Sequence, residues 1–113
     1  MTYVESAVIP VPTNKRAAYL DMAKPMRDRA IEAGAIDVME AWGSDVPDGE
    51  ITSFRKAVQA TDDETIVLSW IIWPNKAACE AGRPKIMADM GPSDFPFDPT
   101  RMIFGGFEPM LDD

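Results

Sequence analysis

Histidine is absent from this chain of 113 residues, and cysteine occurs once, at Cys79. The absence of histidine excludes Ser-His-Asp and Cys-His catalysis in their usual forms, together with the common histidine-rich metal sites. A single cysteine leaves zinc and iron–sulfur clusters without a CxxC ligand pair. The sequence also lacks GxGxxG and GxxxxGKS/T, the glycine patterns that bind dinucleotides and nucleotide phosphates. We therefore expect neither a metal ion nor a cofactor.

Positive charge is scarce as well. The chain has 11 Lys and Arg against 19 Asp and Glu, a net charge of −8, and its basic residues are scattered along the sequence. Nucleic acids and anionic membrane surfaces bind to clustered positive charge, so neither is an expected partner.

Long hydrophobic runs are missing too. The longest apolar stretch, Ile66–Trp73, is interrupted by Ser69 and is far shorter than the roughly 20 residues needed to span a membrane. The first residues show no signal-peptide pattern, and an unpaired cysteine suits a reducing compartment. These features predict a cytoplasmic protein.

What is present predicts one domain over residues 1–113, since 46% of the residues are apolar and the chain is too short for two cores. Apolar alternation predicts strands, apolar residues at helical spacing predict helices, and Pro and Gly mark the turns between them. Thr13 is the expected N-cap of the first helix, and Pro25 is expected to kink it. The expected elements are a strand over Tyr3–Val11, a helix over Asn14–Ala33, a strand over Ala35–Trp42, its continuation over Phe54–Ala60, a strand over Thr65–Trp73, a helix over Asn75–Met90 and a strand over Thr100–Glu108.

The order β-α-β-β-α-β predicts an α+β fold of the ferredoxin-like type, an antiparallel sheet with two helices on one face. The strands carry apolar residues on both faces: in the strand over Thr65–Trp73, Leu68 and Trp70 point to one face and Ile71 and Trp73 to the other. A sheet face without helices would then expose a large apolar patch, which is typical of an interface. We therefore expect a homodimer in which two sheets pack face to face and form a dimeric α/β barrel.

Polar side chains on these apolar strands are the candidates for chemistry: Glu5, Glu40, Ser69 and Arg101. A buried charge must be paired or change its pKa, so Glu40 and Arg101 are expected to pair across the sheet. One interpretation is a ligand pocket in which Arg101 binds an anionic oxygen, Glu40 acts as a base, and Trp42 and Trp70 form aromatic walls. The other is a structural ion pair at a strand end or in the dimer interface.

Three weaker features have structural explanations that compete with functional ones. Asp45 and Asp48 lie in a Pro-Asp-Gly turn, where aspartate usually bonds the local backbone rather than a cation. Cys79 has no neighbouring base and is expected to be a packing thiol. Gly105-Gly106, inside a strand pattern, indicates a bulge or a close backbone approach.

Two segments are unusual for pure core packing, because they place large aromatic residues beside glycines and charges: 41–49 and 101–108. The sequence resembles the bacterial DUF1428 proteins in Trp42–Gly49, Phe54–Val58, Ser69–Trp70, Pro96–Asp98 and Arg101–Glu108. That resemblance implies the dimeric α/β-barrel superfamily, which includes small cofactor-independent monooxygenases and many uncharacterised proteins. The resemblance implies the fold and the dimer but no specific activity, because one fold hosts many activities.

Three functions therefore remain as hypotheses. The first is an enzyme acting on a small organic molecule in a pocket between sheet and helices. The second is a non-catalytic ligand-binding dimer with the same pocket, and the third is a protein-interaction dimer. The candidate pocket residues for the first two are Glu40, Trp42, Ser69, Trp70 and Arg101.

Overall fold

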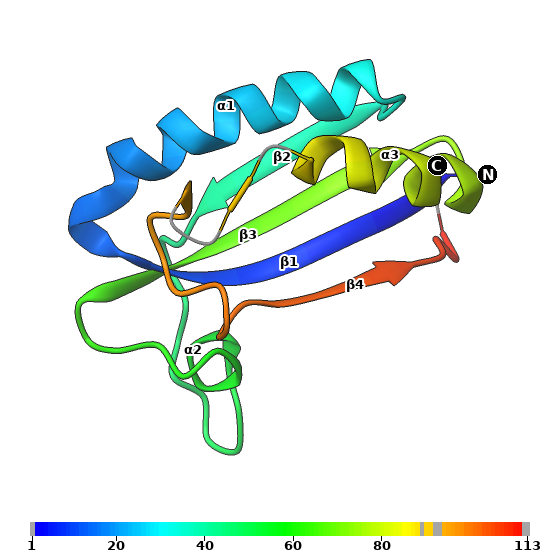
Figure 1. Cartoon of the computed structure of the whole chain (residues 1–113). Coiled ribbons are helices and arrows are strands. Elements are labelled where there is room, and N and C mark those ends of the chain that lie inside the picture. Colours follow the sequence, from blue (N-terminus) through cyan, green and yellow to red (C-terminus); the bar gives the residue numbers. More distant parts are fainter. Residues whose placement is uncertain (1, 89, 92–93, 112–113) are drawn as a thin grey trace.

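A four-stranded antiparallel sheet with the strand order β2-β3-β1-β4 forms the centre of this α+β fold (Figure 1). The computed structural model describes residues 2–88, 90–91 and 94–111. Its elements are β1 (Tyr3–Pro12), the 3₁₀ turn η1 (Thr13–Lys15), α1 (Arg16–Glu32), β2 (Asp37–Trp42), α2 (Phe54–Ala57), β3 (Glu64–Trp73), α3 (Lys76–Met87) and β4 (Ile103–Phe107).

The two central strands pair along their whole length, from Tyr3 opposite Trp73 to Pro12 opposite Glu64. Successive side chains of a strand point to opposite faces, so this register sorts the residues of both strands into two sets. One set packs beneath the helices and forms two core clusters. The first contains Ile9, Val11, Tyr19, Ala23, Val67 and Phe97, and the second contains Ala30, Ala35, Trp73, Cys79 and Ile86.

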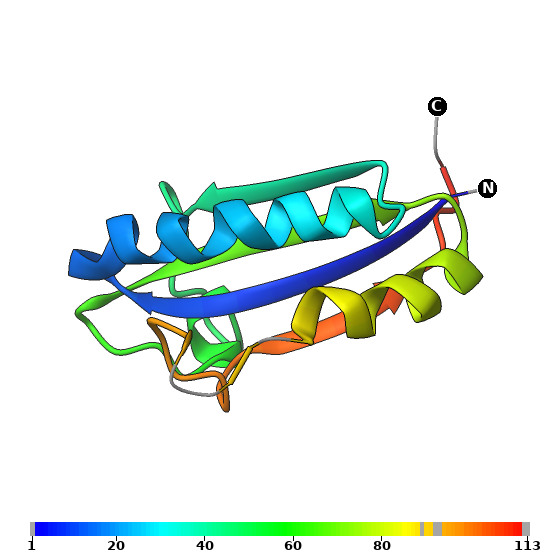
Figure 2. The same cartoon turned by 45° about the horizontal axis from the view of Figure 1, so that its top comes forward.

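Helices α1 and α3 lie side by side on one face of the sheet (Figure 2). The α3 helix begins at an N-cap, because the Asn75 side chain accepts a hydrogen bond from the Ala78 amide at 2.8 Å. Its buried Gly82 lets the helix approach the sheet, since a Cβ there would lie 2.5 Å from the Trp73 ring. Both helices continue through a proline, at Pro25 in α1 and Pro84 in α3.

The two predicted helices and the strands numbered β1 to β4 are confirmed, with ends that differ by a few residues. The strand predicted over Phe54–Ala60 is wrong, because these residues begin with the short helix α2. The Ser53 side chain caps α2 by accepting a hydrogen bond from the Lys56 amide, and this local contact competes with an extended conformation. Thr13 is not a side-chain N-cap either; its hydroxyl lies 2.7 Å from the Thr65 hydroxyl.

One glycine of the β4 pair, Gly106, allows a close approach, which is one of the two explanations that the sequence left open. Gly106 pairs with Glu5, and a Cβ at Gly106 would collide with the Tyr3 ring and hydroxyl. A side chain at this position would therefore displace Tyr3 from the core cluster that it joins.

The face of the sheet opposite α1 and α3 is covered at one end, by α2 and the loop around it (Figure 1). Val58, Pro10 and Ile66 are buried there. Elsewhere this face is apolar and partly open to solvent: Met39, Ile103 and Phe107 are 45%, 44% and 59% exposed. Within one chain the sheet stays open, with β2 and β4 as its edges. No helix in the described part of the chain has the length and apolar character to cross a membrane.

Candidate functional site

A cavity of about 350 Å³ lies between the sheet and helices α1 and α3. Side chains from all four strands, both helices and the segment after α3 form its wall, and most of them are apolar. The lining comprises Glu5, Ser6, Ala7, Ile9, Tyr19, Met22, Ala23, Met26, Glu40, Ser69, Ile71, Arg83, Ile86, Met87, Phe95, Phe97, Met102 and Phe104. Its volume is within the range of small-molecule sites.

The Glu40 carboxylate is the centre of one polar end of this cavity. Its Oε1 accepts a hydrogen bond from the Tyr19 hydroxyl at 2.6 Å, and its Oε2 accepts one from the Ser69 hydroxyl at 2.8 Å. Glu40 lies directly opposite Ser69 in the β2–β3 ladder, which explains why the two side chains meet. Tyr19 reaches them from α1, in the buried stripe of that helix.

Burial is the largest influence on this group. It raises the pKa of Glu40 above its usual value, while the hydrogen bonds from Tyr19 and Ser69 act in the opposite direction. Burial, followed by the nearby Glu40 charge, raises the pKa of Tyr19 above its usual value as well. Glu40 as a whole is nevertheless exposed to solvent, because β2 is an edge strand. The cavity therefore has at its rim a solvent-accessible carboxylate whose partners are neutral hydroxyl groups.

A second polar group in the cavity wall is the ion pair of Glu5 and Arg83. The Arg83 Nε donates a hydrogen bond to Glu5 Oε2, and the Trp73 indole donates one to Glu5 Oε1 at 3.4 Å. Arg83 Nη2 also donates to the sulfur of Cys79 at 3.4 Å. Burial raises the pKa of the Cys79 thiol, and this fully buried side chain packs in the core as the sequence predicted.

Trp42 lies at a smaller cavity of about 80 Å³, which shares Tyr19 and Glu40 with the larger one. The guanidinium of Arg16 lies 5.3 Å from the centroid of the Trp42 ring, a cation–π arrangement that covers the indole. Glu40, Ser69 and Trp42 are therefore brought together on the helix-covered face of the sheet.

Trp70 is not part of this group. It follows Ser69 in β3, and adjacent residues of a strand point to opposite faces, so Trp70 belongs to the face without α1 and α3. The interpretation of Trp42 and Trp70 as two walls of one pocket is wrong for this reason.

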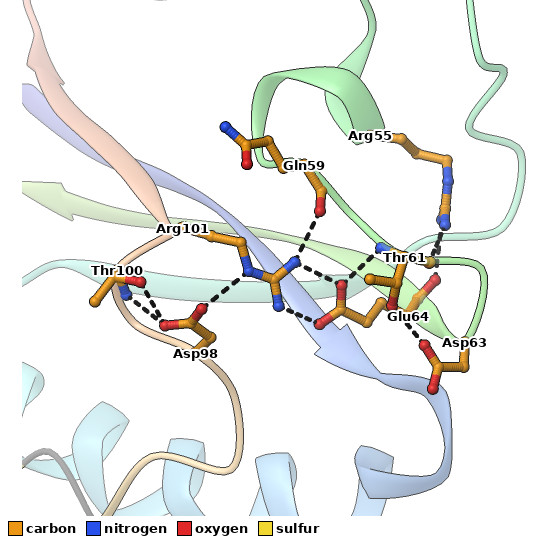
Figure 3. Close-up of polar contacts among 8 residues, drawn as sticks. All are labelled: Arg55, Gln59, Thr61, Asp63, Glu64, Asp98, Thr100 and Arg101. Atoms are coloured by element: carbon orange, nitrogen blue, oxygen red, sulfur yellow. Dashed lines mark hydrogen bonds and ion pairs between the residues drawn. The ribbon is translucent and has the colours of Figure 1, made fainter.

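Arg101 does not pair with Glu40, which corrects the second expectation. Its guanidinium forms a bidentate pair with Glu64, at 2.8 Å from Nη1 to Oε1 and 2.6 Å from Nη2 to Oε2 (Figure 3). Its Nε donates to Asp98 at 3.0 Å, and Nη1 also donates to the Gln59 carbonyl at 2.8 Å. The arginine therefore joins the start of β3, the end of the α2 turn and the segment before β4.

The carboxylates that bind Arg101 also accept hydrogen bonds from neighbouring residues. The Thr61 amide donates to Glu64 Oε1 at 2.8 Å, and the Thr100 amide and hydroxyl both donate to Asp98 (Figure 3). Hydrogen bonding to Arg101 lowers the pKa of Glu64 to about 2, and hydrogen bonding to Thr100 lowers the pKa of Asp98. Gln59 adopts a left-handed backbone conformation, φ 52°, which aims its carbonyl at Arg101.

The aspartates of the Pro-Asp-Gly turn form no cation site in this structure. Gly49 has the positive φ that the turn predicts, at 64°, and Asp48 lies 3.8 Å from Arg55. Over residues 2–88, 90–91 and 94–111, no group of three acidic, cysteine or histidine side chains could hold a metal ion.

Tyr19 and Arg83 are polar cavity residues that were not candidates from the sequence. Tyr19 lies at helical spacing among apolar residues, where a pattern of hydrophobicity does not distinguish it from core, although a buried hydroxyl there needs a partner. Arg83 carried no signal, because its proximity to Glu5 depends on how α3 packs across the sheet.

Comparison with known proteins identifies a family and several relatives of this chain. A family model described as "Protein of unknown function (DUF1428)" matches residues 2–99. The "Uncharacterized protein YbaA" of Escherichia coli (strain K12) is 44% identical over 117 aligned residues, covering 100% of both chains. YbaA of Shigella flexneri matches equally well over the same extent. The chain therefore belongs to the DUF1428 family.

Proposed function

We propose that this protein binds a small, mainly apolar organic molecule in the cavity between the sheet and helices α1 and α3. The observation that carries the proposal is a space of about 350 Å³ whose apolar wall contains a hydrogen-bonded carboxylate, Glu40. Binding sites for small molecules combine an apolar wall with a few convergent polar groups in this way.

The Arg101 cluster is a weaker candidate for a ligand site. Its guanidinium is already bound to Glu64, Asp98 and the Gln59 carbonyl, so an incoming anion would have to displace existing partners. A structural role fits this cluster, although its carboxylate is Glu64 and not the Glu40 that both sequence interpretations paired with Arg101.

Binding is the core of the proposal, and turnover is an extension of it. Glu40 is placed to accept a proton from a bound molecule, as the enzyme hypothesis requires. Arg101 lies in a separate cluster, so a partner for an anionic oxygen would have to come from elsewhere. The non-catalytic alternative needs only the cavity and its polar end.

Toluene provides a direct test, because it carries no head group and probes the apolar wall alone. In amide chemical-shift titrations we expect toluene to perturb the signals of residues around the cavity. Ala23→Phe fills the space from the buried face of α1 and should abolish the response. Ala18→Phe, at an exposed position of the same helix, is the matched control and should leave it intact. An unchanged spectrum of the wild-type protein would refute the proposal.

We also propose a cytoplasmic homodimer built from ferredoxin-like subunits, in which the open sheet faces pack together as a dimeric α/β barrel. The strand order, with α1 and α3 on one face, supports the subunit fold. The opposite face is apolar at Met39, Ile103 and Phe107. Among the residues described, its charged strand residues are Asp37 at the start of β2 and Glu64 at the start of β3, and Glu64 is paired with Arg101. Two copies of a chain with a net charge of −8 repel least at such a face.

Native mass spectrometry tests the dimer directly. We expect the wild type to have twice the mass of the chain and Met39→Lys to be monomeric, because a buried, unpaired ammonium is costly. Ile31→Lys is the control, since Ile31 is 47% exposed on α1, which covers the other face of the sheet. A monomeric wild type would refute the dimer, and a complex with a different protein would favour the interaction hypothesis.

A further inference from the structure

We infer that the cavity selects molecules whose head group donates hydrogen bonds: an aromatic body with an ammonium head binds best, an alcohol binds more weakly, and a carboxylate is rejected. The inference rests on the proposed binding function and narrows its ligand class. It follows from the donors, charges and ring surfaces that line the cavity.

The hydrogen-bond donors at the Glu40 end are already used. A tyrosine or serine hydroxyl carries one hydrogen, and both Tyr19 and Ser69 give theirs to Glu40. What remains for a ligand is acceptor capacity, on the carboxylate and on the two hydroxyl oxygens. A ligand head group that donates hydrogen bonds can bind these acceptors. A head group that only accepts hydrogen bonds would face their lone pairs and be repelled.

The balance of charge in the cavity wall favours the same choice. The wall contains Glu5, Glu40 and Arg83, which sum to −1 when all three are ionised. Arg83 is paired with Glu5, so its charge is compensated and does not offset Glu40. Arg16, which lines the smaller cavity, lies over Trp42. An ammonium group would neutralise this excess, and an anion would add to it.

Aromatic rings and thioethers shape the rest of the space. Phe95 and Phe97 lie 5.3 Å apart between centroids, and Phe97 lies 5.9 Å from Tyr19, so a row of rings leads towards Glu40. Four methionines complete the wall: Met22, Met26, Met87 and Met102. Thioethers and ring faces both make favourable contacts with an aromatic body, and ring faces also attract cations.

Three molecules with one ring and different heads test the inference: benzylammonium, benzyl alcohol and benzoate. Titration calorimetry at neutral pH should rank their affinities in that order, with no saturable binding of benzoate. We expect benzylammonium to bind about tenfold tighter than the alcohol, the size of effect expected for a charge-assisted hydrogen bond. Equal or tighter binding of benzoate would overturn the inference and leave the proposed function intact.

Glu40→Gln assigns the preference to its source, because the amide removes the charge and adds two donors. Benzylammonium should then lose its tenfold advantage over the alcohol, while toluene binding is retained. Glu32→Gln, an exposed change of the same kind at the end of α1, should leave the ranking unchanged. An equal loss in both variants would mean that overall charge sets the preference, which contradicts the inference. If toluene and all three ligands fail to bind the wild type, the proposed function itself is wrong.

Discussion

Glu64 and Glu40 are both carboxylates on the sheet, and their surroundings differ in one decisive respect. Glu64 is 8% exposed and forms a bidentate pair with Arg101, and its pKa is lowered to about 2. Glu40 has neutral hydroxyl partners, and its pKa is raised by burial. The Arg101 charge compensates the Glu64 carboxylate. The hydroxyl partners of Glu40 carry no charge, so the Glu40 carboxylate stays uncompensated beside a cavity.

The difference separates structural from functional use of the same side chain. A buried carboxylate that is fully paired holds segments of the chain together and offers nothing further to a ligand. A carboxylate stabilised by neutral donors is held in place, yet keeps its charge and lone pairs available. This contrast is why the proposed site contains Glu40 and excludes Arg101.

Removing the cation should have the largest effect. Arg101→Met leaves Glu64 buried and without its charged partner, and we expect a loss of about 3 kcal/mol in the free energy of unfolding, the lower end of the range for a broken buried pair because Arg101 stays 23% exposed. Urea denaturation measures the change. Arg27→Met removes an exposed arginine that lies 3.7 Å from Asp28, and this control should cost less than about 1 kcal/mol. Similar losses in both variants would show that the Glu64 pair is not an anchor.

Acidification should affect the two carboxylates in opposite directions. The pKa of Glu64 is lowered from 4.5 to about 2, so its stabilising contribution is complete above pH 4.5 and is lost as the pH falls towards 2. The displacement sets an upper limit near 3 kcal/mol, and the partial exposure of Arg101 reduces the expected loss to about 2 kcal/mol. The pKa of Glu40 is raised, so protonation of this group favours the folded state, and that contribution disappears as the pH rises through its folded pKa.

Unfolding free energies of the wild type, Glu64→Gln and Glu40→Gln between pH 2 and 7 test this contrast. Glu64→Gln should flatten the loss of stability below pH 4.5. Glu40→Gln should leave that acid loss in place and bring little change, or a gain, at neutral pH. A steeper acid loss in Glu64→Gln, or a large neutral-pH cost in Glu40→Gln, would reverse the assignment of the two groups.

Local sequence patterns predicted much of the fold. The apolar alternation of β1, the apolar run of β3 and the predicted helix start at Asn75 correspond to real elements. The segment after Ser53 was mistaken for a strand because two opposing local signals, a side-chain cap and apolar residues, occur within a few positions. In such short stretches the cap contact decides, and periodicity over so few residues carries little information.

The structure brings together some of the candidate residues and separates others, and the reasons differ from residue to residue. Glu40 and Ser69 were identified because polar residues on apolar strands need partners, and they are indeed partners of each other. Trp70 could have been excluded from the sequence, since it adjoins Ser69 in a strand. The partner of Arg101 could not have been found, because Glu64 meets it through loops whose paths leave no periodic signal.

The smallest expected effect concerns the hydroxyl that holds Glu40. Tyr19→Phe keeps the ring contact with Phe97 and removes one hydrogen bond, which should cost about 1 kcal/mol of unfolding free energy. Because that hydrogen bond lowers the pKa of Glu40, its loss should move the carboxyl pKa further upward in a ¹³C NMR titration. Tyr3→Phe removes the hydroxyl of the chain's other tyrosine and should leave the Glu40 titration unchanged. A downward shift of the Glu40 pKa in Tyr19→Phe would mean that water stabilises the freed carboxylate oxygen better than the Tyr19 hydroxyl did. Glu40 would then be a solvated surface group rather than the polar end of a cavity.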